Sequence, residues 1–260
     1  MTNRDAALAI DSLDWRDDRV VLDDVILRLQ NTPSSSELEE RSIAFFKTKR
    51  FIDEYRRFFA ARPDFVPRRI FELGIWDGGS LVFWNEIFRP ERLVAVDLAD
   101  RADDPLFETY VAARGAGDRI ETHWRTDQRD AARLRELAAS FGHPLDLVVD
   151  DASHVYAPTK TSFETLFPFL RPGGIFVIED WAWGHWPEYQ APDHPWRAKT
   201  PPTRLVHELV ELQGSDPGIV ACVTVNPWFV AVERGPDAIV ASESFSLDRH
   251  IAHVGPRVPA

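Results

Sequence analysis

Apolar runs of strand length alternate with helix-like segments over most of this 260-residue chain. Five of the runs predict buried strands, at residues 69–73, 93–97, 119–124, 145–149 and 174–178. The intervening and following segments predict helices, at residues 80–87, 106–113, 131–140, 158–170 and 204–213. Strands that alternate with helices of this length form a parallel sheet with helices on both faces. The sequence therefore predicts an α/β fold with a doubly wound, mostly parallel sheet.

The last two apolar runs, Ile219–Val225 and Trp228–Val232, are separated only by Asn226 and Pro227. So short a link can join only antiparallel neighbours. The sheet is therefore expected to have seven strands and to end in an antiparallel hairpin. A nicotinamide-binding Rossmann domain does not usually end in this way.

The region before the sheet, residues 1–64, is predicted to be an N-terminal helical extension. A break at Asn31–Ser36 separates a short helical element from a long amphipathic helix, which starts at Ser36 and ends before Pro63. This extension is expected to pack on the main domain or on another subunit. The main domain then covers residues 65–235, and residues 236–260 form a C-terminal tail.

The net charge and the cysteine content indicate which binding partners and which cellular compartment to expect. A formal net charge of -12 opposes binding to nucleic acid or anionic lipid, because both require Lys and Arg. The single cysteine, Cys222, lies in an apolar run, which predicts a buried core thiol and a reducing compartment. The N-terminus is too acidic for a targeting peptide, and no apolar run approaches the roughly 20 residues of a membrane span. The protein is therefore expected to be cytoplasmic, with no nucleic-acid or membrane partner.

A glycine-containing loop follows the first predicted strand, at the position where doubly wound sheets bind ligands. It runs from Glu72 to Ser80 and includes Gly74 and Gly79. It lacks the G-x-G-x-x-G pattern that cradles a pyrophosphate. An acidic first residue and this looser glycine set suit a cofactor with a positive sulfonium and no pyrophosphate. Asp97, at the end of the second strand, can accept hydrogen bonds from a ribose, although turn glycines and a strand-end cap would explain the same residues without a ligand.

Acidic and imidazole side chains converge at the ends of two adjacent predicted strands. Asp150, Asp151 and His154 close the fourth strand, and Glu179 and Asp180 close the fifth. Carboxylates this close together destabilise a fold unless a cation or a proton lies between them. Oxygen ligands without a nearby cysteine favour Mg2+, Mn2+ or Ca2+ over Zn2+. Helix capping or solvent exposure would explain any one of these residues, but their convergence favours a metal site.

Such a site suits methyl transfer to a hydroxyl group. A neutral alcohol attacks a sulfonium carbon slowly because its pKa is far above neutrality. A coordinated cation lowers that pKa, and a nearby imidazole can take the proton. His154 is three residues after Asp151, so a helical turn would direct both side chains the same way. The metal and the base would then flank one hydroxyl.

The glycine loop, the acid after the second strand and the terminal hairpin resemble class I S-adenosylmethionine-dependent methyltransferases, over about residues 65–235. The resemblance implies S-adenosylmethionine as the cofactor and a Rossmann-like methyltransferase fold. It implies contacts from Glu72, Gly74, Gly79 and Ser80 to the methionine part, from Asp97 to the ribose, and from Asp127 and Gln128 to the adenine. Asp150 would contact the cofactor or orient a neighbour rather than bind metal. NAD is the competing cofactor, and the missing third glycine and the hairpin argue against it.

The D-x-x-H and E-D arrangement resembles a narrower group. It consists of metal-dependent O-methyltransferases that act on macrolide sugars, of the rhamnosyl and mycinosyl type, and of cephalosporin hydroxylase-like proteins. The segment Leu170–Asp180 matches their pattern well, whereas Ala152 stands where they have glycine. The resemblance implies a general base, His154, and three ligands of Mg2+ or another divalent cation, Asp151, Glu179 and Asp180. The macrolide enzymes carry a larger N-terminal region, which leaves the substrate and the subunit arrangement open.

An insertion rich in aromatic residues, 181–202, separates the fifth strand from the next helix. Aromatic faces beside an active site bind the C–H surfaces of sugars or flat polyketide rings. We expect a substrate lid with contacts from Trp181, Trp183 and Trp186. His185 and His194 are secondary candidates for a substrate contact or a base. Packing on the domain or on a partner subunit would explain any single tryptophan equally well.

Together these features predict an S-adenosylmethionine-dependent, divalent-metal-assisted O-methyltransferase. Its acceptor would be a sugar hydroxyl of a small glycosylated natural product, as in antibiotic biosynthesis, and the enzyme is expected to be a homo-oligomer. A catechol- or phenol-type O-methyltransferase is the alternative with the same chemistry, because two vicinal oxygens can chelate a metal. Two further hypotheses belong to different classes of protein: a cofactor-binding assembly protein without turnover, and an oxidoreductase on the same sheet.

Overall fold

The computed structural model describes residues 6–30, 41–101, 105–239 and 245–254. The chain forms two compact units, one made of residues 1–70 and 75–126 and the other of residues 71–74 and 127–260. The predicted start of the long N-terminal helix at Ser36 lies outside the described residues. Within the described ranges, no helix combines the length and the apolar content that crossing a bilayer requires.

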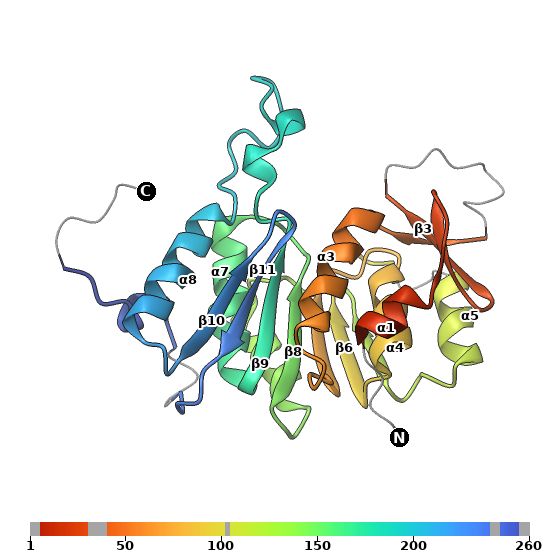
Figure 1. The fold of residues 1–260 in the computed structure, drawn as a ribbon, viewed down its shortest axis with the longest axis horizontal. Helices are drawn as coiled ribbons and strands as arrows, with labels where there is room; N and C mark the ends of the chain where they lie inside the picture. Colours follow the sequence, from red (N-terminus) through yellow and green to blue (C-terminus); the bar gives the residue numbers. More distant parts are fainter. Residues whose placement is uncertain (1–5, 31–40, 102–104, 240–244, 255–260) are drawn as a thin grey trace. The chain divides into compact units, whose positions relative to one another are not determined.

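The main sheet has seven strands in the order β10-β11-β9-β8-β5-β6-β7 (Figure 1). Their bounds are β5 Arg69–Leu73, β6 Arg92–Val96, β7 Ile120–His123, β8 Leu145–Asp150, β9 Leu170–Glu179, β10 Val220–Val225 and β11 Phe229–Arg234. The pairs β6–β7 and β8–β9 are parallel, whereas β11 is antiparallel to both β9 and β10. The predicted fold class, a mostly parallel sheet that ends in an antiparallel hairpin, is confirmed.

Strand β8 shows why the sequence forms a central parallel strand. All six of its residues, Leu145–Asp150, are buried, as expected where helices or loops cover both faces of a sheet. Its first carboxylate, Asp146, is neutralised by the Arg171 guanidinium, whose Nε lies 2.6 Å from Oδ1. Its second carboxylate, Asp150, ends the strand and belongs to the site described below.

In the first unit, helix α3 (Lys49–Ala60) packs on helix α4 (Gly79–Phe88) through aromatic rings. The ring centroids of Tyr55 and Trp84 are 5.0 Å apart, and those of Phe59 and Phe88 are 5.1 Å apart. Each large side chain buried in this way contributes roughly 1.5–3 kcal/mol. The amphipathic helix expected in this region therefore packs on the main domain, and helix α5 (Pro105–Ala113) completes the unit.

Among the described residues the N-terminal region is helical only in part, so the predicted helical extension is wrong for residues 14–29 and 43–45. After helix α1 (Ala6–Asp11), four strands form a separate sheet: β1 Asp14–Trp15, β2 Arg19–Leu22, β3 Val25–Leu29 and β4 Ile43–Phe45. Strands β2 and β3 pair antiparallel across the two-residue turn of Asp23 and Asp24. Asp23 has a φ of 56°, as hairpin turns of this length require. Alternating burial over Val20–Leu22 marks a strand rather than a helix.

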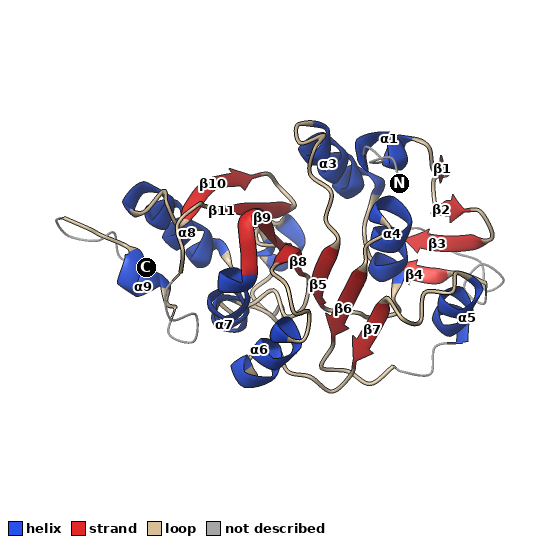
Figure 2. Ribbon diagram, turned by 90° about the horizontal axis from the view of Figure 1, so that it is seen from below, coloured by secondary structure: helices blue, strands red, loops and turns tan. Residues whose placement is uncertain are grey.

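In the second unit, helices α6 (Ala131–Ala139), α7 (Tyr156–Leu166) and α8 (Thr203–Ser215) lie on one side of strands β8, β9, β11 and β10 (Figure 2). A short helix, α9 (Leu247–His250), packs on α8. Cys222 lies on β10 and is partly exposed, so the expected burial of its thiol is wrong. The reason is that β10 is the outermost strand of the sheet and has a neighbour on only one side.

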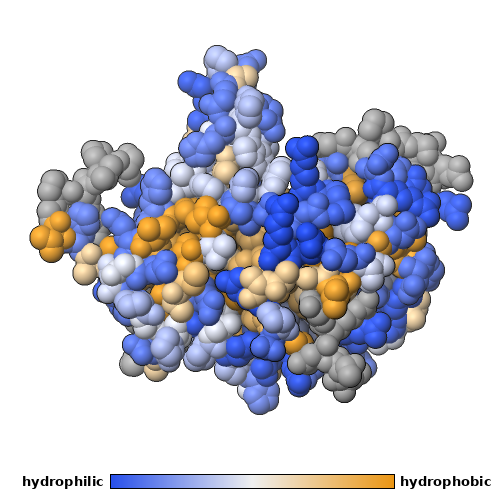
Figure 3. Space-filling view, viewed as in Figure 1, coloured by the Kyte–Doolittle hydropathy of each residue, from blue (hydrophilic) through white to orange (hydrophobic). Residues whose placement is uncertain are grey.

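The aromatic insertion lies between β9 and α8 in the second unit. It contains two single-turn 3-10 helices, Trp183–His185 and Pro187–Tyr189. In Figure 1 it is the teal segment that stands out beyond β9 and α8. The face of this segment visible in Figure 3 is mainly hydrophilic or intermediate in hydropathy.

Candidate active site

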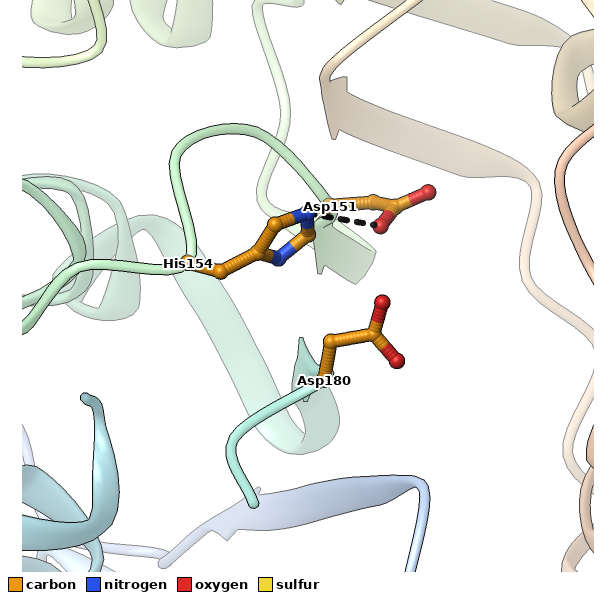
Figure 4. Close-up of side chains that lie close together, drawn as sticks. All are labelled: Asp151, His154 and Asp180. Carbon is orange, nitrogen blue, oxygen red and sulfur yellow. Dashed lines mark ion pairs between the residues drawn. The ribbon is translucent and has the colours of Figure 1, made fainter. Parts of the chain in front are cut away.

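Three of the predicted catalytic and metal-binding residues lie together at the ends of β8 and β9. Asp151 and His154 belong to the loop between β8 and α7, and Asp180 directly follows β9. One ligand atom from each of the three lies within 4.8 Å of the others. Nε2 of His154 is 3.8 Å from Oδ1 of Asp151. Figure 4 shows the three side chains directed toward one common space.

The backbone at this cluster is strained. His154 has a φ of 52° and Asp180 a φ of 50°, in the left-handed region that costs a residue with a side chain roughly 1–3 kcal/mol. Specific hydrogen bonds hold both residues there. The N–H of Asp180 donates to the carbonyl of Trp228 at 2.8 Å, and the carbonyl of His154 accepts from Nε1 of Trp183 at 2.6 Å. Strain retained at two of three cluster residues is typical of a functional site.

Glu179 differs from its neighbour Asp180. It is 1% exposed and sits within β9, opposite Phe229 of β11. Adjacent residues of a strand point to opposite faces, which explains the difference. Among the described residues, the gathered ligand atoms come from Asp151, His154 and Asp180, without Glu179. The role of Glu179 as a third metal ligand stays a prediction.

The donor set fits a divalent cation. Two carboxylates on adjacent strand ends provide hard oxygen ligands of the kind that Mg2+ and Mn2+ prefer. Nε2 of His154 faces Asp151, whereas Nδ1 is buried and has no hydrogen-bond partner within the described chain. The imidazole can therefore accept a proton on Nε2, on the side of the carboxylates.

Asp150 and Gln128 bind each other inside the second unit. Nε2 of Gln128 donates to both carboxylate oxygens of Asp150, each at 2.7 Å, and the Ser162 hydroxyl donates to Oδ2. Burial raises the pKa of Asp150 to about 6, although the Ser162 and Gln128 hydrogen bonds oppose that shift. Sequence reasoning missed Ser162, although a hydroxyl on the buried face of α7 was a usable signal. Oε1 of Gln128 is buried and without a hydrogen-bond partner in the described chain, so it is an available acceptor.

Asp97 fixes the loop that follows β5. Its Oδ2 accepts hydrogen bonds from the N–H groups of Ile75 at 2.8 Å and Trp76 at 2.9 Å. Its Oδ1 accepts from the N–H of Ala99 at 2.8 Å. An ionised carboxylate has about four acceptor positions, so the expected ribose contact remains open to it and stays a prediction.

The two loop glycines allow the protein backbone itself to approach closely. Gly74 has a φ of 95°, and a Cβ there would lie 2.2 Å from the carbonyl oxygen of Asp151. A Cβ on Gly79 would lie 2.3 Å from the carbonyl oxygen of Ala44, in strand β4. The sequence suggests that these glycines admit a ligand, whereas the structure shows that they also admit neighbouring strand ends.

Of the other predicted cofactor residues, two are buried and one is paired with an arginine. Glu72 is fully buried at the end of β5, and Ser80 is buried in the first turn of α4. Asp127 precedes α6, and its Oδ2 lies 2.6 Å from the Arg129 guanidinium. Hydrogen bonding to Arg129 lowers the pKa of Asp127 below its usual range. Asp127 is therefore ionised and already paired, and its contact to adenine stays a prediction.

The tryptophans of the insertion have different surroundings. Nε1 of Trp181 donates to the carbonyl of Asn226 at 2.8 Å, and the ring centroid of Trp186 is 5.9 Å from that of Trp228. Trp183 is only 4% exposed, so it offers no open face to a substrate, contrary to its expected role. His185 is exposed, and its Nε2 lies 3.2 Å from the Thr203 hydroxyl.

A ring cluster connects the insertion to His154. The ring of Trp196 lies nearly parallel to the His154 ring, with centroids 6.3 Å apart. The Trp183 ring contacts that of Trp196 edge-on at 5.1 Å, and Tyr189 packs on His194 at 4.6 Å. The sequence does not predict the contact between Trp196 and His154.

Comparisons with known proteins agree with this architecture. Residues 71–181 match a family model described as a methyltransferase domain. The chain is 35% identical over 152 residues to demethylmacrocin O-methyltransferase of Streptomyces fradiae, covering 55% of this chain and 35% of that protein. It is 42% identical over 115 residues to 8-demethyl-8-alpha-L-rhamnosyl tetracenomycin-C 2'-O-methyltransferase of Streptomyces olivaceus, covering 44% of this chain and 26% of that protein.

A solved structure is similar over a larger part of the chain. It is the MycE methyltransferase from the mycinamycin biosynthetic pathway in complex with Mg, SAH and mycinamycin VI, with a TM-score of 0.55 and 28% identity. The match covers 82% of this chain and 57% of MycE. The matches to the two Streptomyces proteins cover only 35% and 26% of the lengths of those proteins. These matches confirm the resemblance that the motifs indicate.

Proposed function

We propose that this chain, whose residues 71–181 match a methyltransferase domain, is an S-adenosylmethionine-dependent, divalent-metal-assisted O-methyltransferase that acts on a sugar hydroxyl of a natural product. The observation that carries the proposal is the gathering of Asp151, His154 and Asp180 within 4.8 Å at the ends of adjacent strands. The similar proteins are described as O-methyltransferases, and one is described as acting on a rhamnosyl compound.

The chemistry requires one strong nucleophile and one proton acceptor. Asp151 and Asp180 would hold the cation, with Glu179 as the third proposed ligand, and the bound cation would supply the Lewis acidity that lowers the pKa of the acceptor hydroxyl. Nε2 of His154 takes the hydroxyl proton as general base. S-Adenosylmethionine, when bound, would supply the methyl group, because the acceptor oxygen would bond to the methyl carbon as the carbon–sulfur bond breaks and a neutral thioether leaves.

The proposed cofactor contacts are those implied by the resemblance: Glu72, Gly74, Gly79, Ser80, Asp97, Asp127, Gln128 and Asp150. The acceptor atom Oε1 of Gln128 supports a contact to the amino group of adenine, because it is buried and lacks a partner in the described chain. Burial of such an acceptor without a hydrogen bond is costly, so a ligand donor there would be stabilising.

The acceptor is proposed to bind beneath the aromatic insertion. Trp181 and Trp186 are partly exposed, and indole faces bind the C–H surfaces of sugars. A segment that projects from the unit, as this one does in Figure 1, can close over a bound molecule. The insertion is therefore proposed as a substrate lid, with His185 and His194 at its surface as secondary contacts.

The test is a methylation assay with a panel of glycosylated and phenolic acceptors. Purified protein is incubated with S-adenosylmethionine and Mg2+, and mass spectrometry detects acceptors that gain one methylene. We expect gains among the glycosylated acceptors, loss of the gain with EDTA, and recovery with added Mg2+. Gains confined to phenolic acceptors would replace the sugar with a catechol-type substrate.

A thermal-shift experiment distinguishes a methyltransferase from an oxidoreductase and from an assembly protein without turnover. S-Adenosylmethionine and S-adenosylhomocysteine should stabilise the protein, because a ligand at about 100 times its Kd stabilises by about 2.7 kcal/mol. Stabilisation by NAD alone would indicate an oxidoreductase instead. Cofactor binding without any metal dependence or turnover would indicate an assembly protein. The expected homo-oligomer and cytoplasmic location stay predictions, and light scattering on the purified protein tests the first.

A further inference from the structure

The side-chain hydrogen bonds inside the loop that carries His154 are long. The N–H of Val155 donates to Oγ of Ser153 and the N–H of Ala152 donates to Oδ1 of Asp150, each at 3.4 Å. His154 has a φ of 52°, and the following helix α7 begins at Tyr156 without a side-chain hydrogen bond from its N-cap residue, Val155. A strained residue keeps its conformation only when surrounding contacts determine it. Shorter hydrogen bonds reach this loop from outside it.

Those contacts come from the aromatic insertion. Nε1 of Trp183 donates to the carbonyl of His154 at 2.6 Å. The N–H of Tyr156, two residues later, donates to the carbonyl of Thr200 at 2.8 Å. Residues near the start and the end of the insertion thus bind backbone groups on the two sides of Val155, directly after the residue that presents the imidazole.

The His154 side chain is also supported by the insertion. The centroid of the Trp196 ring is 6.3 Å from that of the imidazole, with an interplanar angle of 27°. The Trp183 ring meets the Trp196 ring at 83°, with centroids 5.1 Å apart. Because Trp183 is 4% exposed, the two indoles form a packed support. The supported imidazole points toward Asp151 and Asp180 (Figure 4).

We propose that Trp183 and Trp196 are positioning residues for His154. Trp183 fixes the backbone of His154 through its indole N–H, and Trp196 fixes the plane of the imidazole. Neither residue contacts the reacting atoms. The inference rests on the proposed function, in which His154 is the general base, and it adds that the insertion builds the active site as well as covering it.

The test observes His154 directly, by NMR of protein labelled with carbon-13 in its histidine rings. The chain has eight histidines, and the signal that disappears in His154→Gln identifies His154. Trp183→Phe keeps one aromatic ring but removes the N–H donor and the second ring of the indole, so the His154 signal should shift and broaden. Trp196→Leu removes the neighbouring ring current and should shift the same signal downfield.

A matched control removes an equivalent bond elsewhere. Nε1 of Trp15 donates to the carbonyl of Ile10 at 3.0 Å, so Trp15→Phe loses the same kind of indole-to-carbonyl hydrogen bond. In Trp15→Phe, the NMR signal of His154 and the turnover should equal those of the wild type. In Trp183→Phe, kcat should fall roughly tenfold to a hundredfold, as expected for a misplaced catalytic group, while KM for S-adenosylmethionine is unchanged.

The outcomes separate this inference from the proposed function. An unchanged His154 signal in Trp183→Phe overturns the positioning role, whether or not the protein methylates any acceptor. A moved signal with wild-type turnover also overturns it, because the placement of His154 would then not limit the reaction. If no acceptor is methylated, the proposed function fails while the NMR signals still report on the support of His154. If Trp183→Phe does not fold, the partly exposed Trp196 provides the same test.

Discussion

Gly74 lies so close to Asp151 that a Cβ atom on it would be 2.2 Å from the carbonyl oxygen of Asp151. The N–H of Asp151 in turn donates to the carbonyl of Leu73 at 2.9 Å. Leu73 and Gly74, at the end of β5, are therefore packed against the first proposed metal ligand. A substitution at Gly74 should therefore alter the proposed metal site.

Gly74→Ala should destabilise the protein and weaken metal binding, because the new methyl overlaps backbone that cannot rotate away. Gly115→Ala is the matched control, since Gly115 also has a positive φ, 55°, but nothing within 4 Å of its Cβ position. The free energy of unfolding of the control should fall only by the backbone cost of about 1–2 kcal/mol. The free energy of unfolding of Gly74→Ala should fall by clearly more. Urea unfolding measures both variants, and equal losses would show that the close approach to Asp151 is unimportant.

His154→Ala should lower turnover by roughly a hundredfold or more, the usual contribution of a general base. Binding of S-adenosylhomocysteine and Mn2+ should persist, because the proposed metal ligands are carboxylates. The control is His207→Ala, which replaces an exposed histidine of α8 and should behave as the wild type. Steady-state kinetics and calorimetry provide the measurements, and full activity in His154→Ala would remove its assigned role.

Asp180→Asn should weaken Mn2+ binding more than Glu179→Gln does. The reason is that Asp180 shares the ligand-atom cluster with Asp151 and His154, whereas Glu179 is buried within β9. Electron paramagnetic resonance of free Mn2+ gives the two affinities in the same buffer. The opposite order would make Glu179 the principal ligand of this strand end.

Asp150→Asn should change how stability depends on pH in metal-free buffer. Burial raises the pKa of Asp150 from 3.8 to about 6, so its contribution to stability is fully present below about pH 4 and is lost as the pH rises through 6. A shift of this size corresponds to roughly 3 kcal/mol. Tm values between pH 4 and pH 7 should therefore fall less steeply in Asp150→Asn than in the wild type. Parallel curves for the two proteins would contradict a raised pKa.

The seven-stranded sheet could be predicted because each strand is a local apolar run bounded by turn residues. The N-terminal sheet could not be predicted as easily, because its strands are short and mix charged with apolar residues. Its clearest signal is Asp23-Asp24 between Val20–Leu22 and Val25–Leu29, a two-residue hairpin turn that the helical prediction overlooks. The parallel pairing of β4 with β3 joins residues such as Leu27 and Ile43, which no local pattern reveals.

The site was predictable where it depends on strand ends. Parallel neighbours such as β8 and β9 end at one edge of the sheet, so Asp151 and Asp180 had to lie near each other. The bond from Trp183 to His154 spans 29 residues and depends on the fold of the insertion. For that reason the sequence suggests a substrate contact for Trp183, whereas the structure shows a buried indole.

The most direct test of the proposed catalyst is methyl transfer from S-adenosylmethionine to a rhamnosylated acceptor while Mg2+ is titrated into EDTA-treated protein. For the wild type, we expect a rate that rises with Mg2+ and saturates. For Asp151→Asn, we expect no Mg2+-dependent transfer, although S-adenosylmethionine still binds. Transfer at the full rate in EDTA, or a normal Mg2+ response in Asp151→Asn, would contradict a catalytic metal bound by Asp151.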